Sequence, residues 1–232
     1  MELRTQIKKL SLWVFIIPFI AINLCLFISV NFHLFENTFM QVVQIGRSAP
    51  TFPYFDGGVS ISRTARTYPA YLIFKPSMII SSFLLIIYWF KTNNIINHYQ
   101  NEKGKINSFR VFGILSAIFL IIHSIFLGVK FDYDLYKFFR RFVLLAFIIF
   151  EIIAQSLLVY KFYKLKKIIF NDINNYVLNL KIILVTILVV VAITTLPIVV
   201  TSGNVHFKHA LEWNYFLGVI IFYLFTFMFW KR

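Results

Sequence analysis

Two ionisable side chains, His123 and Glu151, lie inside long apolar runs of the sequence. A charge at the centre of a bilayer costs about 2.5–3.5 kcal/mol even on the most permissive scales. Counted from the ends of their runs, the two residues have similar depths, so neighbouring helices would let imidazole and carboxyl form a hydrogen-bonded pair. Gln155 lies one turn from Glu151 on the same face, and Ser124 adjoins His123. This polar stripe predicts either a proton-handling or headgroup-binding site, or a neutral glutamic acid that only aids helix packing.

A second polar group gathers before the last apolar run and in the long connection after the first one. Its members are His206, His209, Glu212, Asp56, Arg63 and Arg66. If a helix begins near His206, Glu212 is expected to point into the bundle or toward a loop arginine. The alternative for the histidines is that they are solvated loop residues. Across both groups, the candidate site residues are Asp56, Arg63, His123, Glu151, His209 and Glu212.

The sequence contains no motif typical of a metal centre, a hydrolase or a phosphate-binding loop. His206 and His209 have i, i+3 spacing but no third ligand close in sequence, so we predict no metal site. Gly-x-Ser-x-Gly, His-Glu-x-x-His and phosphate-cradling glycine loops are absent. We therefore predict no cofactor, and the sequence leaves open whether the protein is an enzyme.

Six apolar runs must position these residues, and each, with its flanks, is long enough to cross a hydrocarbon core of about 30 Å as a helix. They are Ser11–Val30, Pro76–Phe90, Val111–Val129, Phe142–Tyr160, Ile182–Val205 and Trp213–Trp230. Hydrophobic residues make up 59% of the chain and its mean hydropathy is +0.78, values typical of a membrane protein. We predict one all-α domain over residues 1–232, a polytopic membrane bundle of six transmembrane helices with a long exoplasmic loop between helices 1 and 2. The spans are expected at about residues 11–30, 73–91, 109–130, 142–162, 181–202 and 211–230.

The net charge of +14 fits a chain whose basic residues meet anionic lipid headgroups, and we predict no nucleic-acid partner. With the N-terminus in the cytoplasm, nine of the 23 lysines and arginines fall outside and the rest, Lys181 among them, fall inside. The positive-inside rule therefore predicts cytoplasmic N- and C-termini, in a membrane that the sequence does not identify. Four lysines are expected to anchor a helix end in the headgroups, with a specific phosphoinositide site as the alternative: Lys161, Lys164, Lys166 and Lys167.

The connection between the first two runs, from about Asn31 to Tyr71, is rich in aromatic residues. It should therefore fold against the bundle or lie among the lipid headgroups. Within it, Leu34–Ile45 is expected to form a short interfacial helix ended by Gly46. Val59–Arg66 alternates weakly between apolar and polar residues, which favours an extended segment.

Short motifs in this connection and before the last run resemble the Frag/DRAM/Sfk family. These six-span membrane proteins include damage-regulated autophagy modulators and lipid-remodelling factors that act after GPI attachment. The resemblance rests on Pro53-Tyr54-Phe55-Asp56-Gly57-Gly58, on Pro69 and Phe74, and on Glu212-Trp213. It covers nearly the whole chain, although the serine that often precedes the aspartate in that family is missing. The resemblance implies a role in anchor remodelling, phospholipid distribution between leaflets, or support of a lipid kinase or autophagy, with Asp56 and Glu212 as functional positions.

The leading interpretation is a protein that regulates or remodels membrane lipids through a polar site facing the outer leaflet. Its partners would be membrane lipids and other membrane proteins. The alternative is a small proton-coupled transporter in which Glu151 carries the proton and His123 is its partner. Many transporters contain inverted repeats, and the two halves of this sequence show none. A scaffold that only holds partner proteins is a third interpretation.

Overall fold

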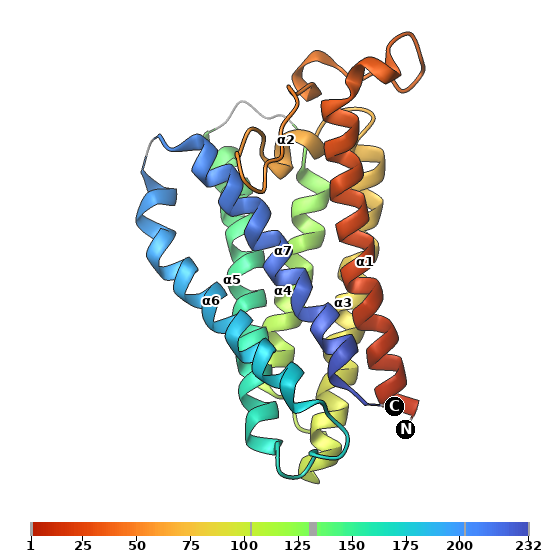
Figure 1. The fold of residues 1–232 in the computed structure, drawn as a ribbon, viewed down its shortest axis with the longest axis vertical. Helices are drawn as coiled ribbons and strands as arrows, with labels where there is room; N and C mark the ends of the chain where they lie inside the picture. The colour runs from red at the N-terminus through yellow and green to blue at the C-terminus, as the bar shows by residue number, and fades with distance from the viewer. Residues whose placement is uncertain (1, 103, 130–133, 202, 232) are drawn as a thin grey trace.

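Helices dominate the computed structural model, which describes residues 2–102, 104–129, 134–201 and 203–231. Of the described residues, 77% are helical, and these residues form no strand beyond an isolated bridge between Ile173 and Trp230. The elements in order are α1 (Glu2–Val30), η1 (Phe32–Phe35), η2 (Gln44–Gly46), α2 (Ile61–Ala65), α3 (Tyr71–Gln100), α4 (Ser108–Phe126), α5 (Asp134–Leu165), α6 (Asn175–Val200) and α7 (Val205–Phe229) (Figure 1). The all-helical fold predicted from the sequence is confirmed.

Six of these helices are long and apolar enough to cross a membrane, which fits a multi-pass integral membrane protein. The 30 residues of α3 make it about 45 Å long, well beyond the roughly 30 Å of a hydrocarbon core. The long helices run alternately up and down, and both chain ends lie at the same end of the bundle (Figure 1). We call this the terminal end. The opposite end, which carries residues 31–70, is called the distal end.

Five helices, α1, α3, α4, α5 and α7, surround the centre of the bundle, whereas α6 packs against α5 and α7. Figure 1 shows α6 and α7 inclined against the more upright remaining helices. Small residues allow helices to approach closely in a membrane. A Cβ atom at Gly113 would lie 2.3 Å from the Trp89 indole, and one at Gly218 would lie 2.7 Å from Leu188. These glycines therefore permit the α3–α4 and α6–α7 contacts.

The connection between α1 and α3 differs from the sequence expectation at two places. The prediction of a helix over Leu34–Ile45 is wrong, because only the short turns η1 and η2 form there. Asn37 between them has a φ of 59°, a left-handed conformation that interrupts a helix. The prediction of an extended segment over Val59–Arg66 is also wrong. The helix α2 forms instead, and Ser60 caps it by accepting a hydrogen bond from the Arg63 backbone N–H.

Residues 31–70, which we call the distal cap, fold onto the first turns of α7. Trp213 Nε1 donates a hydrogen bond to the Val59 carbonyl at 2.8 Å, and Asn214 Nδ2 donates to the Tyr54 carbonyl at 2.7 Å. The rings of Tyr54 and Trp213 also meet edge to face, with centroids 5.0 Å apart. Burial at this contact raises the pKa of Tyr54 above its usual value. The distal cap is therefore docked on the bundle through both backbone and ring contacts.

At the terminal end, Asp172 joins both chain ends to the connection between α5 and α6. Its carboxylate forms an ion pair with Arg4 and accepts a 2.7 Å hydrogen bond from the Tyr99 hydroxyl. Its carbonyl accepts a hydrogen bond from the Lys231 N–H at 2.9 Å. These contacts hold α1, α3 and the C-terminal residues together, and they occupy the Asp172 carboxylate with two partners.

Candidate functional site

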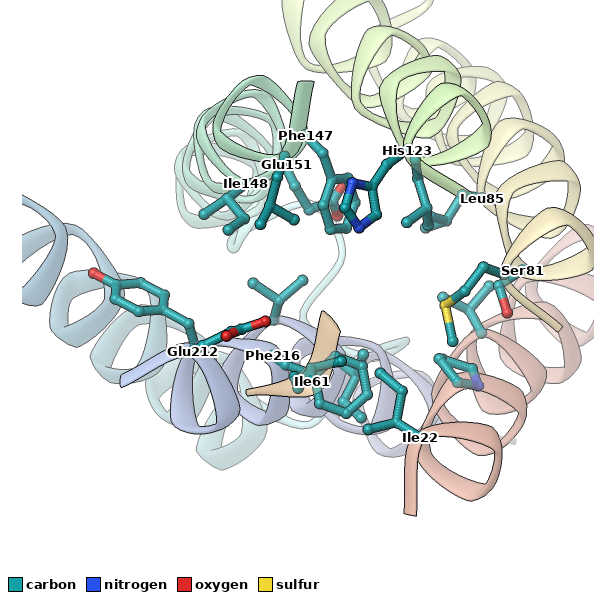
Figure 2. A pocket seen from close by; sticks show the side chains of 18 of the residues that line it. Ile22, Ile61, Ser81, Leu85, His123, Phe147, Ile148, Glu151, Glu212 and Phe216 are labelled. Carbon is teal, nitrogen blue, oxygen red and sulfur yellow. The ribbon is translucent and has the colours of Figure 1, made fainter. Parts of the chain in front are cut away.

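A cavity of about 90 Å³ extends from the distal cap into the middle of the bundle, between α1, α3, α4, α5 and α7. Its wall is mainly apolar, but His123, Glu151 and Glu212 also line it. Figure 2 shows His123 reaching from α4, and Glu212 from α7, toward the same space. A single water needs at least about 10–15 Å³. This central cavity therefore has room for several waters or for one small organic group.

Glu151 of α5 is fully buried, and its carboxyl oxygens accept hydrogen bonds from three side chains. Ser116 Oγ donates at 2.5 Å, Gln155 Nε2 donates at 3.0 Å, and the Tyr223 hydroxyl donates as well. The Gln155 amide also donates to the Val219 carbonyl at 3.2 Å. A buried carboxyl without partners is costly, so these donors are what allow Glu151 to lie among apolar side chains. The carboxyl thereby links α4, α5 and α7.

His123 lines the same cavity, but among the described side chains no hydrogen bond joins it to Glu151. The pair expected from the sequence is therefore absent. Ser116, which contacts Glu151, lies seven residues before His123 on α4, so His123 stands roughly 10 Å farther along the helix. The depths differ because α5 begins at Asp134 rather than near residue 142, which leaves Glu151 farther from its distal end than the apolar run indicated. Ser124 donates to a backbone carbonyl of its own helix and does not contribute to a pair.

Glu212 of α7 lies beneath the distal cap, where its Oε1 accepts a hydrogen bond from the Ser62 N–H at 3.4 Å. Ile61 and Ser62 line the central cavity, so α2 forms the roof above it. Glu151 and Glu212 come from different helices and reach the same mainly apolar space. The cavity therefore presents two carboxyl groups to any molecule that occupies it.

Asp56 lies outside the cavity wall and organises the turn in which it stands. Its carboxylate accepts hydrogen bonds from Thr51 Oγ1 at 2.5 Å and from the backbone N–H groups of Phe52 and Gly58, both at 2.8 Å. The Thr51 hydrogen bond, followed by those from Gly58 and Phe52, lowers the pKa of this exposed carboxyl below its usual value. In this structure, Asp56 therefore shapes the distal cap.

His209 and Arg63 lie at the distal end, His209 between the cap and α7 and Arg63 on α2. His209 Nδ1 is 3.0 Å from the Gly57 carbonyl oxygen. Gly57 has a φ of 60°, and a Cβ atom there would lie 1.8 Å from the His206 carbonyl oxygen, so the cap touches the α7 backbone directly. Arg63 is exposed. Three of the six candidate residues thus line one cavity, and Asp56 and His209 hold the cap that roofs it.

Lys181 of α6 is a buried ionisable residue that was expected among the cytoplasmic headgroups. It is fully buried, and its Nζ donates to Thr226 Oγ1 at 2.6 Å. The Nζ atom lies 3.9 Å from the ring centroid of Phe222, 5.3 Å from that of Phe229 and 5.6 Å from that of Phe162. No described carboxylate forms an ion pair with it. Its apolar sequence neighbours were the only signal that could have indicated this burial.

Tyr223 and Thr226 bring the buried acid and the buried base to one stretch of α7. They are three residues apart, so they share a face and are separated by about 4.5 Å along the axis. Tyr88 of α3 packs its ring 5.0 Å from that of Tyr223. Its hydroxyl faces Thr226, although no hydrogen bond of regular geometry joins the two described groups. Hydroxyl groups from two helices therefore lie between Glu151 and Lys181.

Within the described ranges, no three histidine, cysteine, aspartate or glutamate side chains are placed to hold a metal ion. No family model matches the chain, and no curated protein or solved structure is detectably similar to it. A function for the protein is therefore inferred from the geometry of the central cavity.

Proposed function

We propose that the central cavity binds the ammonium-bearing headgroup of a membrane phospholipid, and that the protein handles or remodels membrane lipids. The observation that carries this proposal is that Glu151 and Glu212 line one mainly apolar cavity among helices long enough to span a membrane. With room for one small organic group, the cavity suits a headgroup amine rather than a whole lipid.

The wall of the cavity has two features that suit an organic cation. The two carboxyl groups can accept hydrogen bonds from an ammonium group and carry negative charge when ionised, and several aromatic rings supply faces that attract ammonium groups. The aromatic lining residues are Phe74, Phe147, Tyr215, Phe216 and Tyr223. Neither lysine nor arginine is found among the described lining residues, so an anionic headgroup would meet carboxyls without a matching strong base. His123 can donate a hydrogen bond to the phosphate that neighbours the amine in a zwitterionic headgroup.

The resemblance to the Frag/DRAM/Sfk family supports the same proposal, because it implies a role in membrane lipids. Glu212, one of the two positions singled out by that resemblance, lines the cavity. If the termini are cytoplasmic, as the distribution of basic residues predicts, the cavity under the distal cap serves the outer leaflet.

Binding can be measured by native mass spectrometry of the purified protein with short-chain lipids that share acyl chains but differ in headgroup. We expect phosphatidylcholine or phosphatidylethanolamine to compete for this cavity, and Glu212→Gln to weaken their binding about tenfold, the effect of losing roughly 1.4 kcal/mol. Glu151→Gln should act in the same direction. In cells, Glu212→Gln should change lipid composition or leaflet distribution while the amount of protein stays normal.

Glu36→Gln is the matched control, because Glu36 is an exposed glutamate of the distal cap that pairs with Arg47 at 3.5 Å. It should leave headgroup binding unchanged. Binding that is equally strong in the wild type, in Glu212→Gln and in Glu151→Gln would refute the proposal, as would unchanged cellular lipids in both cavity variants.

A proton-coupled transporter is the second candidate, and the full burial of Glu151 in the cavity wall favours it. Without a hydrogen bond to His123, proton exchange at Glu151 would involve its actual partners Ser116, Tyr223 and Gln155. Vesicles containing the protein and holding a pH gradient should then accumulate labelled choline, and Glu151→Gln should abolish the accumulation. Vesicles of wild-type protein that show no pH-driven uptake would exclude this candidate.

A further inference from the structure

A groove of about 440 Å³ lies between α5 and α6, and it shares no lining residue with the central cavity. Apolar side chains form most of its wall, among them Val159, Ile182, Val185 and Val190. The stretch of α6 that lines it, residues 182–190, is roughly 12 Å long. One leaflet of hydrocarbon is about 15 Å thick, half of the bilayer core. The groove therefore matches the length of the apolar part of one leaflet.

Two exposed tyrosines, Tyr160 and Tyr163, line the groove where α5 approaches the terminal end. Tyrosine is typical of the interface between hydrocarbon and headgroups. The Nζ atom of Lys164 lies 4.4 Å from the centroid of the Tyr160 ring. This contact places a cationic group at the mouth of a mainly apolar groove.

Lys164 belongs to a cluster of four lysines at this end of α5 and just beyond it: Lys161, Lys164, Lys166 and Lys167. None of the four forms an ion pair with a described carboxylate. The acid that follows in the sequence, Asp172, is already paired with Arg4 and Tyr99. The positive charge at the mouth of the groove is therefore not balanced within the described protein.

We infer that this groove is a binding site for one anionic phospholipid. An acyl chain lies between α5 and α6, and the phosphate lies among Lys164 and its neighbouring lysines. Charge decides the class of lipid, because each lysine near an anionic headgroup contributes attraction that a zwitterionic headgroup largely lacks. The site goes beyond the proposed function, since it lies toward the opposite end of the bundle and selects the opposite headgroup charge.

The test is native mass spectrometry of the full-length protein with phosphatidylglycerol and phosphatidylcholine of identical acyl chains. We expect phosphatidylglycerol to be retained preferentially, and Lys164→Gln to weaken its binding about fivefold, as expected for the loss of one basic residue near the headgroup. Val190→Trp keeps the charge and fills the groove, and it should also reduce retention of phosphatidylglycerol.

Two variants serve as matched controls. Lys9→Gln removes an exposed lysine at the terminal end of α1, and Ile193→Trp adds the same bulk on an exposed position of α6 outside the groove. Neither should alter the retention of phosphatidylglycerol. Glu212→Gln should not alter it either, which separates this inference from the proposal for the central cavity.

Several outcomes would overturn the inference. Equal retention of the two lipids would show that the lysines do not select headgroup charge. An equal effect of Lys9→Gln and Lys164→Gln would show diffuse surface attraction rather than a site. Unchanged retention in Val190→Trp, or competition by glycerol phosphate as strong as that by phosphatidylglycerol, would show that the groove does not hold the lipid chain.

Discussion

The ammonium group of Lys181 and the hydroxyl group of Thr226 are joined by a 2.6 Å hydrogen bond inside the bundle. Thr226 Oγ1 also donates to the Phe222 carbonyl at 2.9 Å, so it does not depend on Lys181 for a partner. Three phenylalanine rings lie near the Nζ atom, and no described carboxylate pairs with it. Among the described residues, the Thr226 hydroxyl and these ring faces are therefore the groups that stabilise the fully buried amino group.

Lys181→Met should raise the stability of the protein. Methionine keeps a similar length and apolar contacts, and it removes an amino group that is buried without a described carboxylate partner, a burial that costs a few kcal/mol. The ring faces and the Thr226 hydroxyl recover only part of that cost. We expect a gain of about 1–2 kcal/mol, or a thermal midpoint several degrees higher. Lys9→Met, at an exposed position of α1, is the control and should change the midpoint little. A lower midpoint for Lys181→Met would mean that the ammonium stabilises the α6–α7 contact.

Tyr223→Phe should destabilise the protein by about 1.5–3 kcal/mol, because it removes a donor from the buried carboxyl of Glu151. Tyr215→Phe is the matched change on the same helix, where the hydroxyl donates to the Leu188 carbonyl at 3.0 Å. That acceptor is a neutral backbone group, so loss of the hydrogen bond to it should cost about 0.5–1.5 kcal/mol. Chemical unfolding of both variants gives the comparison. Equal losses would contradict a special role for the Glu151 hydrogen bond.

Gly57→Ala should detach the distal cap from α7. Gly57 has a φ of 60°, and the new Cβ would lie 1.8 Å from the His206 carbonyl oxygen. Gly104→Ala is the control. Gly104 has a φ of 77°, and a Cβ atom there would have no described neighbour within 4 Å. This variant should therefore cost only the backbone strain of a left-handed residue, about 1–2 kcal/mol. Thermal unfolding should show a clearly larger loss for Gly57→Ala. Similar losses in the two variants would show that the close approach to His206 is relaxed at little cost.

The distal cap should lose stability when acid protonates Asp56. Hydrogen bonds, above all the one from Thr51, lower the pKa of Asp56 below 3.8, so the folded cap favours the ionised form. This stabilisation is complete above the ordinary pKa and is lost as the pH falls through the lower folded-state value. Protection factors from amide exchange over residues 51–58 should be lower in Asp56→Asn than in the wild type at pH 6. The two proteins should become similar only below pH 3.8. Glu36→Gln, in the same cap, should show no such pattern.

Local interactions explain which parts of the cap could be predicted. The aromatic content indicated a segment that either folds against the bundle or lies among the headgroups, and the contact of Tyr54 with Trp213 shows that it folds against the bundle. The helix expected over Leu34–Ile45 did not form, since Asn37 adopts a left-handed conformation that a pattern of apolar residues does not reveal. The role of Asp56 also emerged only from its hydrogen bonds to Thr51, Phe52 and Gly58.

The candidate site could be predicted in part for a similar reason. Ionisable side chains are costly inside a bilayer, so Glu151 and His123 could be recognised from the sequence as candidate site residues. Both line the central cavity together with Glu212. Their hydrogen-bonded pair did not form, because the ends of the apolar runs were a poor measure of relative depth. Lys181 was misplaced for the same reason, since its helix already starts at Asn175, before the expected span, and the side chain points toward Thr226.

Hydropathy along the chain was sufficient to predict an all-helical fold with six helices long enough to cross a membrane. Each apolar run, with its flanks, is long enough to span the hydrocarbon core of a bilayer as a helix. The partners of Glu151, the burial of Lys181 and the shared cavity of Glu151 and Glu212 were decided only by the tertiary structure. These features depend on how far each helix slides and rotates against its neighbours. The packing of side chains between helices sets this shift and rotation, which cannot be predicted from the apolar pattern of a single helix.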